Sequence, residues 1–358
     1  MAPKRPRSAG AETQAVAPTA GPKANPQPLY AALDLGTNSC RMLIAKPVGA
    51  QFTVVDSFSK SVQLGAGLEK TGRLSRASMN RTLQALRICS QKLKRYGVPN
   101  MRLVATEACR RAENGSYLMR QVRKETGLKL EIIKAEEEAQ LAVVSCAPLV
   151  DQQTEQLLVV DIGGGSTELV WIDLSKVPAA QRSHTIMCMH RGFTHPQNHE
   201  LNGAKVVDWI SVPFGVATLR DQFIDVEDDA GRFALMSLKF EEHLERFAPY
   251  DRDHVMDNFQ IIGTSGTVTT VAASHLGLKR YDRNKVDGMS MSSAQVDVVS
   301  KATEHVNQNV TSVAAGAEEM AVSIKEIAVN SSEAARVTLE AVGKAQETTN
   351  KVSRLEAS

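Results

Sequence analysis

Short apolar runs alternate with helical patterns along residues 29–299 of the chain. Runs rich in Val, Ile and Leu that are bounded by turn residues predict β-strands. These runs read LYAALDL, RMLIA, FTVVDSF, RLVATE, LEIIK, LLVVDI, ELVWI and FQIIG. The clearest helix pattern covers 75–96, where Leu83, Leu86 and Leu93 recur near helical spacing. Strand pairs followed by helices favour a layered α/β fold.

Residues 300–358 carry a different pattern. Apolar or small residues recur there in alternating steps of four and three, from Val306 to Leu355. This heptad repeat predicts one long coiled-coil helix, through which the chain would form a homo-oligomer. An amphipathic surface helix is the alternative, but such helices usually end before about 25 residues.

Composition adds further limits. Residues 1–28 are dominated by Pro, Ala, Gly and Thr without periodicity, which predicts a disordered tail. The net charge of +2 gives no general attraction to nucleic acid or to a membrane surface. No apolar run approaches the ~18 residues of a membrane span. The five cysteines form no CxxC pair, which favours a reduced, cytoplasmic setting.

Two segments follow the same plan of apolar run, Asp, tight turn and second apolar run. They are LDLGTNSCRMLIA at 33–45 and VDIGGGSTELVWI at 160–172. Glycines in such turns let backbone N–H groups face an anion, and hydroxyl and amide side chains add donors. One such turn is more often an ordinary hairpin, but two copies indicate duplicated halves facing one cleft. The predicted phosphate-binding residues are Gly36, Thr37, Asn38, Ser39, Gly163, Gly164, Gly165, Ser166 and Thr167.

A third glycine turn lies in IIGTSGTVTTVA at 261–272, between a predicted strand and a predicted helix. Amide groups at a helix N-terminus can meet an anion or a nucleotide. We therefore add Gly263, Ser265, Gly266 and Thr267 to the predicted phosphate-binding residues.

These motifs resemble those of known proteins. DLGTNS, DIGGGSTE and GTSGT resemble the phosphate-1, phosphate-2 and adenosine motifs of the actin/sugar kinase/Hsp70 superfamily. More narrowly, about residues 29–292 resemble the exopolyphosphatase/guanosine pentaphosphate phosphohydrolase family. The other matching stretches, in family order, are VQLGAGL (62–68), ATEACRRAEN (105–114), LEIIKAEEEAQLA (130–142) and SVPFGVATL (211–219).

The resemblance implies two RNase H-like, actin-like domains, which we expect at 29–149 and 150–299. It also implies a hydrolase that releases terminal phosphate from inorganic polyphosphate or guanosine pentaphosphate. Family members continue for several tens of residues beyond the DRNKVDGMSMS stretch, where this chain turns to heptads. We therefore expect the second domain to lack its C-terminal part, which puts the activity in doubt.

Hydrolysis of a phosphate chain requires an attacking water, a base and cations that neutralise charge. The match to the family's EEAR-like motif assigns the role of base to Glu138. Without the family, this Glu run is typical of a solvated helix start, where the helix dipole favours it. Asp161 and Glu168 resemble the family's metal-linked and water-linked carboxylates, and Asp34 occupies the equivalent place in the first turn. Mg²⁺ fits such a site because it binds through few carboxylates plus substrate phosphates.

Two arginines are the predicted phosphate clamps. Arg41 and Arg110 each follow a motif, NSCR and EACR, and a guanidinium binds phosphate through two nitrogens. Surface ion pairs are the alternative for both. The His- and Cys-containing stretch 187–200 matches no zinc-ligand pattern, so we expect a polar loop there.

Residues 301–355 resemble a second family, the cytoplasmic helix of methyl-accepting chemotaxis proteins. The AEEMA stretch at 317–321 is similar to the region where such receptors carry methylated glutamates. We therefore interpret the chain as a fusion of two fragments. An alternative function follows, in which an inactive fusion acts as a coiled-coil self-associating or signal-transduction fragment. An ATP-dependent kinase is a third possibility, which Arg41 in the first turn argues against.

Overall fold

The computed structural model describes residues 28–49, 51–191, 200–247 and 258–299. The chain divides into two compact units, one ending at Thr264 and one beginning at Ser265. The predicted N-terminal tail up to residue 27 and the predicted coiled coil at 300–358 lie outside the described residues.

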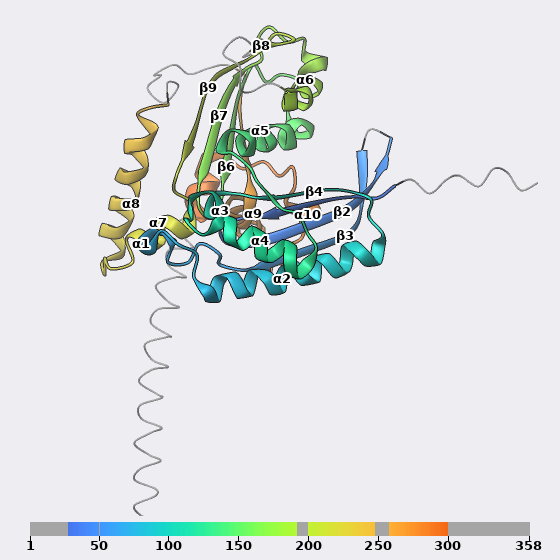
Figure 1. Cartoon of the computed structure of the whole chain (residues 1–358). Coiled ribbons are helices and arrows are strands. Elements are labelled where there is room, and N and C mark those ends of the chain that lie inside the picture. Colours follow the sequence, from blue (N-terminus) through green and yellow to red (C-terminus); the bar gives the residue numbers. More distant parts are fainter. Residues whose placement is uncertain (1–27, 50, 192–199, 248–257, 300–358) are drawn as a thin grey trace, which may run out of the picture. The chain divides into compact units, whose positions relative to one another are not determined.

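The first unit contains a mixed five-stranded sheet in the order β3-β2-β1-β4-β5 (Figure 1). β1 runs antiparallel to β2 and parallel to β4, and β2 runs antiparallel to β3. Its strands are β1 (Tyr30–Leu35), β2 (Ser39–Val48), β3 (Gln51–Ser61), β4 (Asn100–Ala105) and β5 (Glu131–Ile132). Each lies on a run that the apolar pattern predicts.

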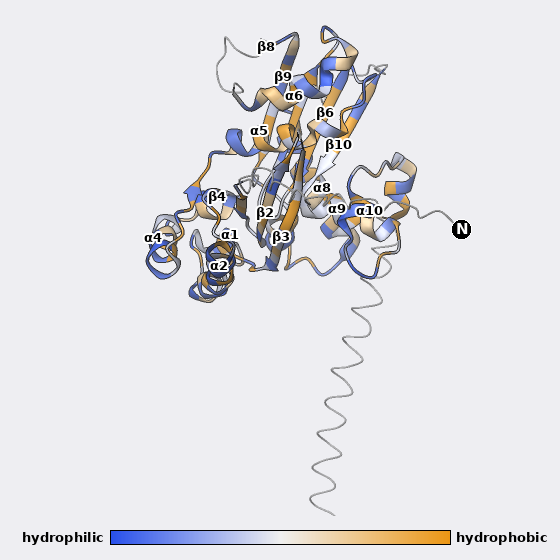
Figure 2. Ribbon diagram, turned by 90° about the vertical axis from the view of Figure 1, so that its right-hand side faces the viewer, coloured by the Kyte–Doolittle hydropathy of each residue, from blue (hydrophilic) through white to orange (hydrophobic). Residues whose placement is uncertain are grey.

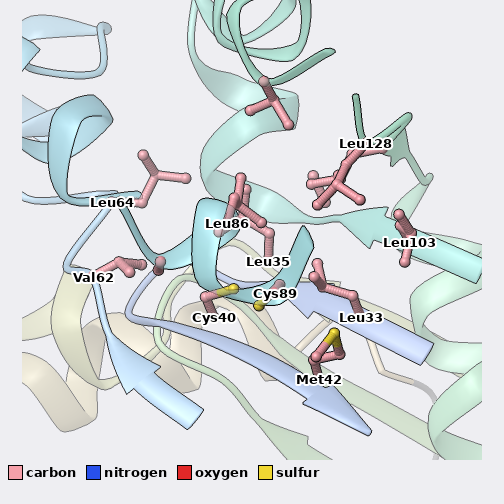
Figure 3. Packing of buried hydrophobic residues seen from close by; sticks show 14 of the residues in the cluster. Leu33, Leu35, Cys40, Met42, Val62, Leu64, Leu86, Cys89, Leu103 and Leu128 are labelled. Atoms are coloured by element: carbon pink, nitrogen blue, oxygen red, sulfur yellow. The ribbon is translucent and has the colours of Figure 1, made fainter. Parts of the chain in front are cut away.

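Helices cover this first sheet. The predicted long helix is confirmed as α2 (Arg76–Tyr96), where the Ser75 side chain caps the N-terminus and Gly97 ends it in the left-handed region. The others are α1 (Leu68–Thr71), α3 (Glu107–Arg111) and α4 (Gly115–Thr126). Leu33, Leu35 and Leu86 meet in the buried cluster between the sheet and the helices (Figure 3).

The second sheet is also mixed and has the order β10-β6-β7-β9-β8. Its strands are β6 (Gln156–Ile162), β7 (Thr167–Asp173), β8 (Glu200–Leu201), β9 (Ala204–Val212) and β10 (Phe259–Thr264). The α-helices of this part are α5 (Ala135–Cys146), α6 (Arg182–Cys188), α7 (Val216–Gln222) and α8 (Asp229–Leu244). Short 3₁₀ turns occupy η1 (Ala147–Leu149), η2 (Ala179–Gln181) and η3 (Met189–Arg191).

β7 is buried on both faces of the second sheet. Val170 and Ile172 belong to the cluster that α5 covers, whereas Leu169 and Trp171 belong to a separate cluster with residues of α8. Successive strand residues point to opposite faces, so two apolar layers enclose this strand. In Figure 2 the strands carry much of the hydrophobic colour, while α2 and α4 show both colours, as expected for helices that bury one side.

The two sheets share one plan. β3-β2-β1-β4 in the first corresponds to β9-β7-β6-β10 in the second, with the same strand directions. The predicted α/β fold with duplicated halves is confirmed in these sheets. β9 is absent from the strands predicted above, because Lys205 and Asp208 interrupt its apolar pattern.

The second unit contains α9 (Ser265–His275), α10 (Arg283–Val286) and further helical residues at 293–299. α9 and α10 contact each other. Within the described ranges, no helix is both long and apolar enough to cross a membrane. The cysteines are all free thiols.

Candidate functional site

The two predicted phosphate turns have the same backbone geometry. Between β1 and β2, the Gly36 N–H donates to the Ser39 carbonyl at 2.9 Å. Between β6 and β7, the Gly163 N–H donates to the Ser166 carbonyl at 3.0 Å. The same four-residue turn therefore follows the first strand of each sheet and carries Asp34 or Asp161 just before it.

The two turns also lie against each other. A Cβ added to Gly164 would lie 3.0 Å from the Asn38 Cβ, and one added to Gly165 would clash with the Thr37 hydroxyl. Glycine is therefore required here for close approach. Thr37 is 5% exposed, and its Oγ1 has no hydrogen-bond partner among the described residues. A buried hydroxyl without a partner is costly, which favours a ligand oxygen at this place.

One further glycine packs closely against each turn. The Gly65 N–H donates to the Thr37 carbonyl at 2.9 Å, and a Cβ on Gly65 would clash with the Thr37 methyl group. A Cβ on Gly215 would clash with the Gly163 carbonyl oxygen. These glycines lie in the VQLGAGL and SVPFGVATL stretches, whose role the sequence did not reveal. They follow β3 and β9, the third strands of the two halves.

Four carboxyl groups at or near the turns influence one another electrostatically, namely Asp34, Glu138, Asp161 and Glu168. Glu138, in the first turn of α5, has its pKa raised to about 7, mainly by burial. The Arg110 charge lowers this pKa, whereas the charges of Asp34 and Asp161 raise it. A carboxyl group with a pKa near neutrality can accept a proton from water efficiently at physiological pH. The role of Glu138 as the base stays a prediction, with which this raised pKa agrees.

Glu168 is the most deeply buried of the four, with 2% of its surface exposed. Its pKa is raised to about 8, mainly by burial and in addition by the charges of Glu138 and Asp161. The Ser211 hydroxyl donates to its Oε1 at 2.9 Å and so favours the ionised form. Ser211 is a site residue that the sequence analysis did not identify.

Asp34 keeps solvent-exposed surface, although the surrounding protein desolvates its carboxyl group. Its pKa is raised to about 6, chiefly by this loss of surrounding water; Arg41 lowers it and Asp161 raises it. Arg41 is exposed and stands directly opposite Asp34 in the register of β1 and β2. No ready-made group of three or more His, Cys, Asp or Glu ligands occurs in the described part of the chain.

Arg110 is held by protein groups on two sides. It binds the carboxylates of Glu107 at 2.5 Å and Glu138 at 3.1 Å. One of its nitrogens also donates to the Ile133 carbonyl at 2.8 Å. The surface alternative does not describe this arginine, whose side chain is only 20% exposed. Glu107 is a second neighbour that the sequence analysis missed, although a Glu and an Arg three residues apart on a helix are a typical ion pair.

The remaining predicted residues differ in their surroundings. The Thr167 hydroxyl donates to the Phe214 carbonyl at 2.8 Å, so this group already has an acceptor. Asn38 is exposed, and the Ser61 hydroxyl lies 3.5 Å from its Oδ1. Gly263 lies in β10, whereas Ser265, Gly266 and Thr267 begin the second unit. The site is therefore defined by residues of the first unit.

Several known proteins resemble this chain in sequence and in fold. A "Guanosine-5'-triphosphate,3'-diphosphate pyrophosphatase" of Aeromonas salmonicida is 30% identical over 257 residues. That match covers 72% of this chain but 45% of the relative, so the chain spans less than half of that protein. The crystal structure of an Aquifex aeolicus member of the Ppx/GppA family has 28% identity and a TM-score of 0.53, covering 75% of this chain and 76% of that one.

A further solved structure, of an exopolyphosphatase-like protein, has 27% identity and a TM-score of 0.61 and covers 76% of this chain and 77% of its own. These likenesses confirm the actin-like α/β fold. The family model of Ppx/GppA phosphatases matches residues 43–315, past the domain boundary predicted at 299. The resemblance predicted from DLGTNS and DIGGGSTE is thereby confirmed, and the chain belongs to the Ppx/GppA phosphatase family.

Proposed function

We propose that this chain hydrolyses the terminal phosphate of inorganic polyphosphate or of guanosine pentaphosphate. The observation that carries the proposal is the position of Glu138, whose pKa is about 7, next to Asp34 and Asp161 at the start of the paired turns. Family membership supports phosphatase chemistry. The printed name of the Aeromonas salmonicida relative supports the guanosine nucleotide as one of the two substrates.

The reaction requires one proton transfer and one exchange of P–O bonds. Glu138 accepts a proton from water while the water oxygen attacks the terminal phosphorus. The bond from this phosphorus to the bridging oxygen breaks, and orthophosphate and a shortened chain leave. An ionised Glu138 is needed for the first step, so activity should fall as pH falls through about 7.

The turns would hold the phosphate groups. Backbone N–H groups at such turns bind anions, and the Thr37 hydroxyl supplies a donor that the protein does not use itself. Arg41 is exposed at the rim of the first turn, where its guanidinium can bind two phosphate oxygens. We assign phosphate binding to these groups, and we assign to Glu138 the role of the base that accepts a proton from the attacking water.

The donor chemistry fits Mg²⁺. Asp34, Asp161 and Glu168 offer oxygen ligands. The charges of neighbouring carboxylates raise the pKa values of Asp34, Glu138 and Glu168, which indicates excess negative charge that a cation would offset. Asp34 and Asp161 would bind the metal directly, with Glu168 orienting water next to it. When bound, such a metal would neutralise charge on the phosphate oxygens.

A phosphate-release assay tests the proposal. Long-chain polyphosphate and guanosine pentaphosphate are offered separately with Mg²⁺ to the wild-type chain and to Glu138→Gln. We expect the variant to lose about 100-fold or more in kcat, because a positioned base contributes this much. Glu137→Gln is the matched control, since this neighbour pairs with Arg102 instead. Equal release by wild type and Glu138→Gln, or no release by wild type from either substrate, would contradict the proposal.

A further inference from the structure

Glu107 is a buried carboxylate next to the site for which the proposed function has so far supplied no role. It begins α3 and is 7% exposed. Its Oε2 accepts hydrogen bonds from Arg110 Nη2 at 2.5 Å and Nε at 3.1 Å. A Cβ on Gly165 would lie 3.2 Å from the Glu107 Cγ, so Glu107 also packs against the second turn.

The opposite side of the Arg110 guanidinium faces the predicted base. Nη1 donates to Glu138 Oε2 at 3.1 Å and to the Ile133 carbonyl at 2.8 Å. The fork of Nε and Nη2, which is the edge suited to binding two oxygens of an anion, is occupied by Glu107. Glu138 therefore receives one N–H from this arginine instead of two.

This division affects how well Glu138 can act as a base. Two parallel hydrogen bonds from a guanidinium hold a carboxylate firmly and favour its ionised form, which makes it a weaker proton acceptor. They would also occupy both of its oxygens, one of which must face the attacking water. A competing carboxylate on the other edge of Arg110 prevents this arrangement.

We propose that Glu107 is a positioning residue, which holds the Nε–Nη2 edge of Arg110 so that Glu138 keeps one oxygen available for water. This inference rests on the proposed function, because it assigns a task within that reaction. It also limits Arg110, whose best phosphate-binding edge is already occupied. Arg41 then remains the better candidate for a two-nitrogen grip on the substrate.

Kinetics of Glu107 variants test the inference. In Glu107→Gln the charge is lost at nearly constant shape, and we expect kcat to fall about tenfold while KM stays within about twofold. Glu107→Asp restores the charge and should recover part of kcat. Glu125→Gln is the matched control, because Glu125 forms a 2.5 Å ion pair with Arg87 and has no part in the site. Its kinetics should equal those of the wild type.

Two kinetic results would overturn the inference. One is an unchanged kcat in Glu107→Gln. The other is an equal loss of kcat and an equal fall in Tm in the Gln and Asp variants, which would indicate a merely structural role.

A crystal structure of Glu107→Gln separates this inference from the proposed function. We expect the Arg110 guanidinium to turn and bind both oxygens of Glu138. An Arg110 that keeps its original contacts would contradict the inference, whatever the activity. If the wild-type chain released no phosphate, the proposed function would fail, and this structure would still decide whether Glu107 keeps Arg110 away from Glu138.

Discussion

The two halves of the first unit place opposite charges at the same position. Across β1 and β2, Asp34 stands opposite Arg41, whereas across β6 and β7, Asp161 stands opposite Glu168. The backbone turns between them are alike, with one N–H to carbonyl bond of nearly equal length. The same backbone plan therefore carries an arginine in one half and a second carboxylate in the other, which under the proposed function would serve phosphate and a cation with its water.

Burial explains why the two ends behave differently. β2 exposes Arg41, whereas β7 is enclosed by apolar layers on both faces, so that Glu168 is 2% exposed. A carboxylate in such surroundings loses its water, and its pKa rises to about 8. Arg41, at the open position, stays accessible from solvent. The surrounding layers, more than the turns, therefore distinguish the two positions.

Among variants that test this difference between the halves, Glu168→Gln should have the largest effect on activity. The amide keeps the shape of the side chain and can still accept the Ser211 hydroxyl, but it cannot carry charge. We expect kcat for phosphate release to fall about 100-fold, because the carboxylate that would orient water beside the metal is lost. The free energy of unfolding should not decrease, because a buried carboxylate is removed. Steady-state kinetics and urea unfolding measure both, and a kcat near that of the wild type would remove Glu168 from the site.

Alanine substitutions at Gly215 and Gly65, which pack against the two turns, should lower the free energy of unfolding by different amounts. In Gly215→Ala the new methyl group meets backbone atoms of Gly163 and Gly164, which cannot move aside without distorting the second turn. We expect a loss of about 3 kcal/mol in the free energy of unfolding. In Gly65→Ala it meets the Thr37 side chain, which can rotate, so about 1 kcal/mol is expected. Denaturant unfolding of both variants provides the measurement, and equal losses would show that the two turns are supported alike.

Sequence patterns predicted the strands, helices and turns that are determined by residues close together in the chain. The strands of both sheets, apart from β8 and β9, follow from apolar runs, and α2 follows from its periodicity and from Ser75 at its start. The paired turns could be predicted because their glycines and aspartates recur in sequence. The packing of Gly215 against Gly163 could not be predicted, because it joins the segment after β9 to a turn far earlier in the chain.

Glu107 shows the same limit at the site. Its sequence neighbours give a short helix start, where an acidic residue is ordinary. Its burial arises from Gly165 in the other half of the unit and from Arg110, which it shares with Glu138 on α5. Such contacts depend on how the duplicated halves pack together, and the periodicity of the sequence does not predict this packing.

Removing the exposed cation should have a smaller effect than removing the buried acid. In Arg41→Gln the first turn keeps its backbone N–H groups but loses the guanidinium opposite Asp34. We expect KM to rise about tenfold with kcat nearly unchanged, because the lost interaction holds the substrate equally in the ground and transition states. Lys46→Gln is the control, since Lys46 is an exposed cation farther along β2. A large fall in kcat would place Arg41 in the chemical step.

The smallest expected effect concerns the two aspartates, one from each half, that act on Glu138. Both raise its pKa, and Asp34 contributes more than Asp161. Asp34→Asn and Asp161→Asn should each lower the pKa of Glu138 below its value of about 7, with the larger change in Asp34→Asn. Carboxyl-carbon NMR titration in the presence of a chelator measures this without substrate or metal. A lower pKa keeps Glu138 ionised at lower pH, so any remaining activity should persist further into the acid range. A rise of the Glu138 pKa in either variant would mean that the two halves do not share one electrostatic site.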